Sequence, residues 1–269
     1  MRDIERFLDE DIGRGDITTE LVVPEISGRA SIICEKDAVV SGIREACLVF
    51  SMLGADASEV VSDGDRVKAG DRIISVAGPV RDILTAERTA LNFLMRMSGI
   101  STATAKAAEL LGKDSGTKVC GTRKTTPGFR KYEKKAIRFG GGAEHRFGLY
   151  DMILIKDNHI KACGSVRTAM AEAKKTQFHV KIEIEVSNVE DAVTAAKMGA
   201  DIIMADNMNP GEVRELRDAV RRVSSGILVE ASGDITLDNI ADFAGCADLV
   251  SMGSLTHSVV SIPFSMDLD

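Results

Sequence analysis

The segment VKIEIEVSNVEDAVTAAKMGADIIMADNMNPGEVRELRDAVRRV (180–223) decides the architecture of the C-terminal part of the chain. Residues 180–186 alternate apolar and polar side chains as a β-strand does, and residues 189–199 form a helical pattern that ends in glycine. The same order returns at once, with an apolar strand at 201–207 and a helix at 210–223. Successive strand–helix units predict parallel strands joined by helical crossovers.

The pattern continues on both sides of this segment. Further strands are expected at 117–124, 151–157, 226–233 and 247–254, and further helices at 127–141, 165–175 and 236–245. The units recur about every 20 to 28 residues, which favours an α/β barrel of the TIM type, closed or nearly closed. An open doubly wound sheet is the competing arrangement.

The N-terminal part of the sequence has no such rhythm. A short helix at 1–10, strands within 28–42 and 59–79 and a helix at 43–54 follow one another in mixed order. A long helical pattern covers 81–111, where Gly99 is expected to break the helix. We therefore place one domain at 1–105, which the C-terminal residues could complete, and a barrel domain at 106–269.

Charge is distributed unevenly along this acidic chain. The formal net charge is -7, yet the segment 118–161 holds 11 Lys and Arg against 4 Asp and Glu. The acidic total argues against general nucleic-acid binding, whereas local positive charge can concentrate an anionic ligand. The start of the chain is too charged for a signal peptide, and no run of about 20 apolar residues predicts a membrane span. Five scattered cysteines without CxxC spacing indicate reduced thiols and a cytoplasmic location.

Polar residues gather where the barrel strands end, and in α/β barrels the active site lies at the C-terminal strand ends. Basic residues end the first two strands, carboxylates the next two, and small glycine-containing turns the last two. The basic side suits a multiply charged carboxylate or phosphate, and the carboxylates suit ribose hydroxyls or Mg²⁺. The glycine turns expose N–H groups for a phosphate. The pattern predicts an enzyme that joins an anionic small molecule to a phosphorylated sugar.

Simpler interpretations exist for some of these side chains. Glu183 and Glu185 share one strand face, and such carboxylates can merely pair with neighbouring lysines. Lys134, Lys135 and Arg138 lie in a helix and are expected to be mostly a solvated face.

The glycines and histidines are also open to more than one interpretation. The triple glycine 140–142 suits a hinge as well as an anion cradle. His179 precedes a strand and is expected to be structural. His145, His159 and His257 follow turns or strand ends and are better candidates for a functional role.

Longer motifs occur in a fixed order along the chain. They are EDIGRGDITTELV (10–22), ERTALNFLMRMSGIST (87–102), GTRKTTPGFRKYEKKAIRFGGGAEHRFGLYDMILIKDNHI (121–160), IEIEV (182–186), ADNM (205–208), EASGDI (230–235) and SMGSLTHS (251–258). In these motifs the chain closely resembles nicotinate-nucleotide pyrophosphorylase (carboxylating), also called quinolinate phosphoribosyltransferase. The resemblance implies an α/β fold with an N-terminal α/β sandwich domain and an incomplete (open) α/β barrel. It also implies a homodimer, or a higher homo-oligomer, in which the neighbouring subunit completes each active site.

The resemblance further implies a reaction and its site residues. Quinolinate and phosphoribosyl pyrophosphate (PRPP) would give nicotinate mononucleotide, pyrophosphate and CO₂, with Mg²⁺ held mainly by PRPP and in part by Glu185 and Asp206. Catalytic roles fall to Lys124, Lys156, Glu185 and Asp206. Quinolinate contacts would come from Thr122, Arg123, His145, Arg146 and Lys156, with Arg88 reaching in from the other subunit. PRPP contacts would come from Lys124, Glu185, Asp206, Ser232, Gly233, Gly253 and His257.

One position departs from the family pattern, which usually has Ser-Gly-Gly-Ile where this chain has Ser232-Gly233-Asp234-Ile235. An aspartate beside a phosphate would repel it, and it could not easily replace a glycine with positive φ. Three alternative functions stay open from the residues: a related protein associated with molybdenum transport, a Schiff-base aldolase that uses Lys156, and a nucleic-acid-binding module built on the basic segment.

Overall fold

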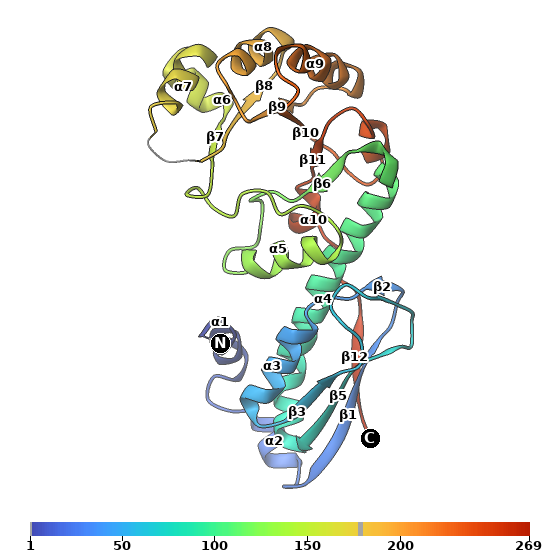
Figure 1. The fold of residues 1–269 in the computed structure, drawn as a ribbon. Helices are drawn as coiled ribbons and strands as arrows, with labels where there is room; N and C mark the ends of the chain where they lie inside the picture. The colour runs from blue at the N-terminus through green and yellow to red at the C-terminus, as the bar shows by residue number, and fades with distance from the viewer. Residues whose placement is uncertain (1, 177–179) are drawn as a thin grey trace. The chain divides into compact units, whose positions relative to one another are not determined.

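The computed structural model describes residues 2–176 and 180–269, so His179 lies outside the described residues. The chain forms two compact units (Figure 1). Unit 1 comprises the chain up to Ala103 together with Lys131–Gly140 and Val259–Asp269, and unit 2 comprises Thr104–Arg130 and Gly141–Ser258. None of the described helices has the length and apolar composition that a membrane crossing requires.

Unit 1 is built on an antiparallel sheet of four strands in the order β12-β1-β5-β3. The C-terminal strand β12 pairs with β1, so the two ends of the chain share this sheet. Helix α3 packs against β3 and β5, and fully buried Ile32, Ile74 and Phe50 lie in the core. The elements are α1 (Arg2–Ile12), α2 (Ile17–Val22), β1 (Ser27–Cys34), β2 (Ala38–Val39), α3 (Ile43–Leu53), β3 (Asp56–Glu59), β4 (Arg66–Val67), β5 (Arg72–Pro79), α4 (Val80–Leu111), α5 (Arg130–Phe139) and β12 (Phe264–Leu268).

Helix α4 runs without interruption for 32 residues. Its buried positions recur every three or four residues, as in Ala86, Ala90, Leu94 and Met97, which gives one apolar face. The prediction that Gly99 breaks this helix is wrong. A Cβ at Gly99 would lie 2.5 Å from the Val260 carbonyl oxygen, so the glycine provides room for the returning C-terminal chain.

Helix α5, the centre of the basic segment, belongs to unit 1 from Lys131 onward. The prediction of a mostly solvated face is wrong for two of its lysines. Lys134 is 1% exposed, and Lys135 Nζ lies 2.8 Å from Glu45 Oε1. Arg96 of α4 pairs with the fully buried Glu133 at 2.6 Å. These contacts use the charges of α5 to attach the helix to the rest of unit 1, whereas Arg138 is exposed as expected.

Unit 2 contains a parallel sheet of six strands in the order β6-β11-β10-β9-β8-β7. Helices α7, α8 and α9 cover the outer side of this sheet (Figure 1). The elements are η1 (Lys113–Ser115), β6 (Lys118–Cys120), β7 (Ile153–Ile155), α6 (Asp157–Cys163), α7 (Val166–Ala173), β8 (Ile182–Val186), α8 (Val189–Lys197), β9 (Ile202–Asp206), α9 (Pro210–Val223), β10 (Leu228–Ser232), η2 (Ile240–Phe243), β11 (Leu249–Ser251) and α10 (Ser254–His257).

The order of the strands decides between the two expected topologies. Strands β7 to β11 follow one another in one direction, and β6 then pairs with β11. This is the progression of a barrel, whereas a doubly wound sheet would reverse direction. Between β6 and β7 the described residues form only an isolated bridge, from Cys120 to Ala143, so the barrel is open there, as the family resemblance implied.

Short elements at the strand ends differ from the sequence prediction. The pattern at 236–245 predicted a helix, but only the 3-10 turn η2 forms there. The Asn239 side chain accepts a hydrogen bond from the Thr236 N–H, and such local bonds compete with a regular helix. The short helices α6 and α10 were not predicted, and both directly follow strand ends.

Candidate active site

A cavity of about 510 Å³ opens at the C-terminal ends of the parallel strands in unit 2. A volume of this size lies within the range of small-molecule sites. Its lining carries four Lys or Arg and four Asp or Glu side chains. The cavity is therefore polar with its charges separated, and it is not simply basic. The predicted residues that line it are Thr122, Arg123, Lys124, His145, Arg146, Lys156, Glu185, Asp206, Ser232, Gly233, Gly253 and His257.

Two arginines form the cationic side of the cavity. Arg123 follows β6, and Arg146 lies in the loop before β7. The Nε atoms of both guanidinium groups are buried and have no hydrogen-bond partner among the described residues. Burial, and next the charge of Arg123, lower the pKa of Arg146, so the two groups lie close together. Two neighbouring guanidinium groups with unpartnered Nε atoms are suited to an anion with two acidic groups.

The carboxylates Glu185 and Asp206 end strands β8 and β9 on the other side of the cavity. Lys156, at the end of β7, places its Nζ 2.9 Å from Glu185 Oε2. Burial and then the charge of Glu185 raise the pKa of Asp206, which shows that the two carboxylates face each other. The Lys156 side chain is 48% exposed and ion-paired, which is not the desolvated setting of a Schiff-base lysine.

The predicted phosphate-binding residues meet at the end of β11. A Cβ at Gly253 would lie 2.9 Å from Lys124 Cδ and 3.1 Å from His257 Nε2. The glycine therefore leaves room for the Lys124 and His257 side chains beside this turn. The Thr256 hydroxyl donates to the Lys124 carbonyl oxygen at 2.7 Å, which attaches the loop after β6 to α10.

Backbone strain is concentrated around this cavity. Among the described residues, the three non-glycine positions with positive φ are His145 (54°), Asn207 (55°) and Asp234 (46°), and all three line it. Each costs conformational energy, and such costs cluster at functional sites. Gly233 has φ 111°, and a Cβ there would lie 2.2 Å from Asn207 Oδ1. Asp234 therefore adopts a left-handed backbone conformation, although an aspartate was not expected to replace a glycine easily there. Its side chain is exposed.

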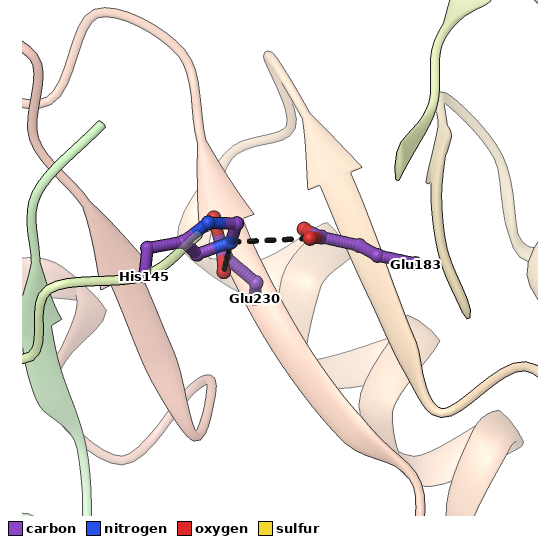
Figure 2. A group of neighbouring side chains, drawn as sticks. All are labelled: His145, Glu183 and Glu230. Carbon is purple, nitrogen blue, oxygen red and sulfur yellow. Dashed lines mark ion pairs between the residues drawn. The ribbon is translucent and has the colours of Figure 1, made fainter. Parts of the chain in front are cut away.

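His145 contacts two fully buried carboxylates at the base of the cavity (Figure 2). Its Nε2 lies 3.1 Å from Glu183 Oε2 and 3.2 Å from Glu230 Oε2. Its Nδ1 accepts a hydrogen bond from the Arg146 N–H at 2.8 Å. Glu230 also accepts a hydrogen bond from the Ser251 hydroxyl. We call His145, Glu183 and Glu230 the buried triad.

The pKa values of His145 and Glu183 in the buried triad are both raised. Burial alone would lower the pKa of His145, but the two carboxylates outweigh it and raise this pKa to about 9. Burial likewise raises the pKa of Glu183. Because Nδ1 accepts from the Arg146 N–H, the ring proton on Nε2 faces the two carboxylates.

Several sequence predictions differ from this geometry. The partner of Glu183 is His145 and not a lysine. The contact of Arg88 with a neighbouring subunit's site stays a prediction, and Arg88 lies in unit 1 on the exposed side of α4. The triple glycine ends α5 and does not contribute to the described lining. His159 caps α6 by accepting from the Lys156 N–H at 2.8 Å, so its observed role is structural.

Sequence reasoning missed several residues of the site. Glu183 and Glu230 were not assigned roles, although a carboxylate inside an otherwise apolar strand indicates a buried charged group with a function. Asn207 shapes the turn beside Gly233, and Ser251 bonds Glu230. Ser254 Oγ is buried without a hydrogen-bond partner among the described residues and lines the cavity. No local pattern marks these three.

An open α/β barrel that carries separated cationic and acidic sides at its strand ends defines a class of protein: enzymes that bring together polyanionic small molecules. The particular family follows from comparison with known proteins. Residues 16–98 match the quinolinate phosphoribosyl transferase N-terminal domain, and residues 100–267 match the C-terminal domain of the same family. The chain belongs to the quinolinate phosphoribosyl transferase family.

Individual relatives agree over nearly the whole chain. It is 42% identical over 269 residues to the probable nicotinate-nucleotide pyrophosphorylase [carboxylating] of Bacillus subtilis, covering 98% of this chain and 92% of that protein. It is 38% identical over 243 residues to the human nicotinate-nucleotide pyrophosphorylase [carboxylating], covering 89% and 82%. The solved structure of the Francisella tularensis nicotinate-nucleotide pyrophosphorylase superposes with a TM-score of 0.93 at 36% identity, covering 100% of this chain and 95% of that chain.

Proposed function

We propose that this chain transfers the phosphoribosyl group of PRPP to quinolinate, with loss of CO₂, to form nicotinate mononucleotide and pyrophosphate in de novo NAD synthesis. One observation carries the proposal: the cavity sets Arg123 and Arg146, whose buried Nε atoms have no hydrogen-bond partner among the described residues, against a side that carries Glu185 and Asp206. A dicarboxylate suits the first side, and a ribose suits the second. Both substrates are anionic, so a site that separates its charges is needed to hold them together.

Quinolinate binding is assigned to the cationic side. Its two carboxylates are held by Arg123, Arg146 and Lys156, with the Thr122 hydroxyl beside them. Arginine forks bind carboxylates through two parallel hydrogen bonds, which also fixes the orientation of the ring. His145 was predicted among these contacts, but both of its ring nitrogens face protein groups. We therefore leave it out of direct substrate binding.

PRPP binding is assigned to the opposite side and to the glycine turns. Lys124, Gly253 and His257 receive its phosphate groups, while Ser232 and Gly233 form the turn after β10. Hard divalent cations prefer oxygen ligands. Glu185 and Asp206 offer two carboxylates that repel each other until a cation binds between them. They would hold Mg²⁺, which neutralises charge on the pyrophosphate when bound.

The chemistry that follows requires positioning more than covalent catalysis. Departure of pyrophosphate, assisted by Lys124, leaves positive charge on the ribose, which Glu185 and Asp206 face and stabilise. The pyridine nitrogen attacks the anomeric carbon. The positive charge on the ring nitrogen stabilises the electron pair left at C2 as CO₂ departs, and C2 then takes up a proton from water. No nucleophilic side chain is needed.

The active unit is proposed to be a homodimer. Arg88 is exposed on α4 and is free to serve a neighbouring site, as the family resemblance implies. The expected effect of Arg88→Ala is a higher quinolinate KM, and mixing this variant with an Arg123→Ala variant should restore part of the activity through hybrid dimers. The cytoplasmic location stays a prediction from the spacing of the cysteines.

The test is direct. Purified protein is incubated with quinolinate, PRPP and Mg²⁺, and nicotinate mononucleotide is followed by chromatography. Nicotinate replaces quinolinate in the control, since an enzyme of nicotinate salvage would prefer it. Formation of product from quinolinate with release of CO₂ supports the proposal. Turnover of nicotinate alone, or of neither acid, contradicts it.

A further inference from the structure

The proposed reaction gives no role to Glu183 and Glu230 of the buried triad. Glu183 and Glu230 lie on β8 and β10, the strands that flank β9, and their side chains are 0% exposed. Glu185 and Glu230 pair with the same residue of β9, Met204, so Glu230 stands level with the ribose side of the cavity. Glu183 lies two residues deeper on the same strand face.

Burying these carboxylates is costly. Both oxygens of Glu183 and Oε2 of Glu230 lack hydrogen bonds among the described residues, and both carboxylates lie within 3.2 Å of His145 Nε2. Buried ion pairs contribute little net stability, because desolvation offsets their attraction. Apolar side chains would stabilise the barrel interior better. The triad therefore serves the site and not the stability of the fold.

The backbone at His145 has an unusual conformation. This residue has φ 54°, which a side chain with a Cβ seldom adopts. The ring is held from both sides, by the two carboxylates at Nε2 and by the Arg146 N–H at Nδ1. The next side chain along the chain is the Arg146 guanidinium, whose position depends on this turn.

The charges around Arg146 also link it to the buried triad. Burial, and then the charge of Arg123, lower the pKa of Arg146, and the charge of Glu183 opposes that shift. Because Glu183 favours the charged form of Arg146, less reorganisation is needed when the substrate binds.

We infer that Glu183 and Glu230 are positioning residues that act through His145: they hold the turn at 145–146 so that Arg146 and Arg123 form a dicarboxylate clamp before quinolinate binds. The inference rests on the proposed function for the identity of the dicarboxylate. It assigns His145 to the support of the clamp and leaves substrate contact to the arginines.

The experiment compares Glu183→Gln and Glu230→Gln, which keep the side-chain volume, with Glu190→Gln on the exposed side of α8 as the matched control. The triad variants should raise the quinolinate KM about 10- to 100-fold, because displacement of a binding group by about 1 Å can have an effect of this size. The PRPP KM should change less than about twofold. Calorimetric binding of quinolinate without PRPP should weaken by the same factor as the KM rises.

A double-mutant cycle tests whether the carboxylates act through the ring. In a His145→Asn background, Glu183→Gln should cause no further loss, because the group it acts through is already absent. Additive losses in the cycle overturn the inference. So do folded triad variants, checked by circular dichroism, that bind quinolinate as the wild type does.

A measurement on the wild-type protein covers the case in which the variants do not fold. The chain has only 4 histidines, so ¹⁵N-labelled imidazole signals can be assigned. The His145 signals should show Nε2 protonated, with little change on addition of quinolinate. A large change would show direct substrate contact and overturn the inference. A stoichiometric metal ion bound by the triad, found by elemental analysis, would overturn it as well.

These experiments distinguish failure of the proposed function from failure of the inference about the buried triad. If the wild type does not convert quinolinate and PRPP, the proposed function fails. If the wild type converts them and the triad variants behave like Glu190→Gln, only the inference fails.

Discussion

Replacement of Arg123 by lysine tests the clamp most directly. Arg123 Nε is buried without a hydrogen bond among the described residues, beside Arg146. On binding a carboxylate, the guanidinium fork makes two hydrogen bonds to a charged group, each worth about 1.5–3 kcal/mol. Lysine keeps the charge and one bond and loses the other. The expected fall in kcat/KM is about 10- to 150-fold, whereas Arg123→Ala, which loses both bonds, should cost about 10²- to 10⁴-fold.

The assay uses initial rates with quinolinate varied at saturating PRPP and Mg²⁺, and the product is quantified by chromatography. Arg167→Lys, on the exposed side of α7, is the matched control and should behave as the wild type does. Binding of quinolinate without PRPP, measured by calorimetry, separates affinity from turnover.

Two results would refute the reasoning about Arg123. Activity of Arg123→Lys within about twofold of the wild type would show that no bidentate contact exists at this position. A loss confined to the PRPP KM would place Arg123 on the phosphate side of the cavity and reverse the assignment of the two substrates.

Three further outcomes follow from the structure. The pKa of His145 is raised from 6.5 to about 9, so the native state binds the proton of His145 more tightly than the unfolded state does. The stability that this proton contributes, about 3 kcal/mol at most, is fully present below pH 6.5 and is lost as the pH rises through about 9. Urea unfolding from pH 6 to 9.5 should show a flatter dependence of stability on pH in His145→Asn than in the wild type, and parallel dependences would contradict this prediction. Asp234→Gly should remove strain of about 1 kcal/mol at φ 46° and lower the PRPP KM; an unchanged KM would mean that the carboxylate points away from phosphate. Glu133→Gln should destabilise the protein by about 1.5–3 kcal/mol in urea by removing the charge that accepts the hydrogen bond of Arg96, and a loss no larger than that of Glu190→Gln would exclude a structural role for this pair.

Local sequence patterns determined much of this protein. Side-chain periodicity located the six parallel strands and most of their crossover helices, because the repeats of 2 and 3.6 residues follow from backbone geometry alone. Parallel strands must end at a common edge, so the same patterns indicated that Arg123, Lys156, Glu185 and Asp206 would meet. The motifs between 87 and 258 were enough to identify the family, which the comparisons confirmed.

Tertiary structure decided the features that depend on contacts between distant residues. Periodicity shows that α5 has two faces, but not that its lysines would meet Glu45 in unit 1. Glu183 and Glu230 are separated by an entire strand–helix unit, and only the closeness of β8 and β10 across β9 brings both to His145. The left-handed backbone at Asp234 likewise depends on its surroundings. Local patterns determine which way a side chain points, whereas only the folded chain determines what it meets.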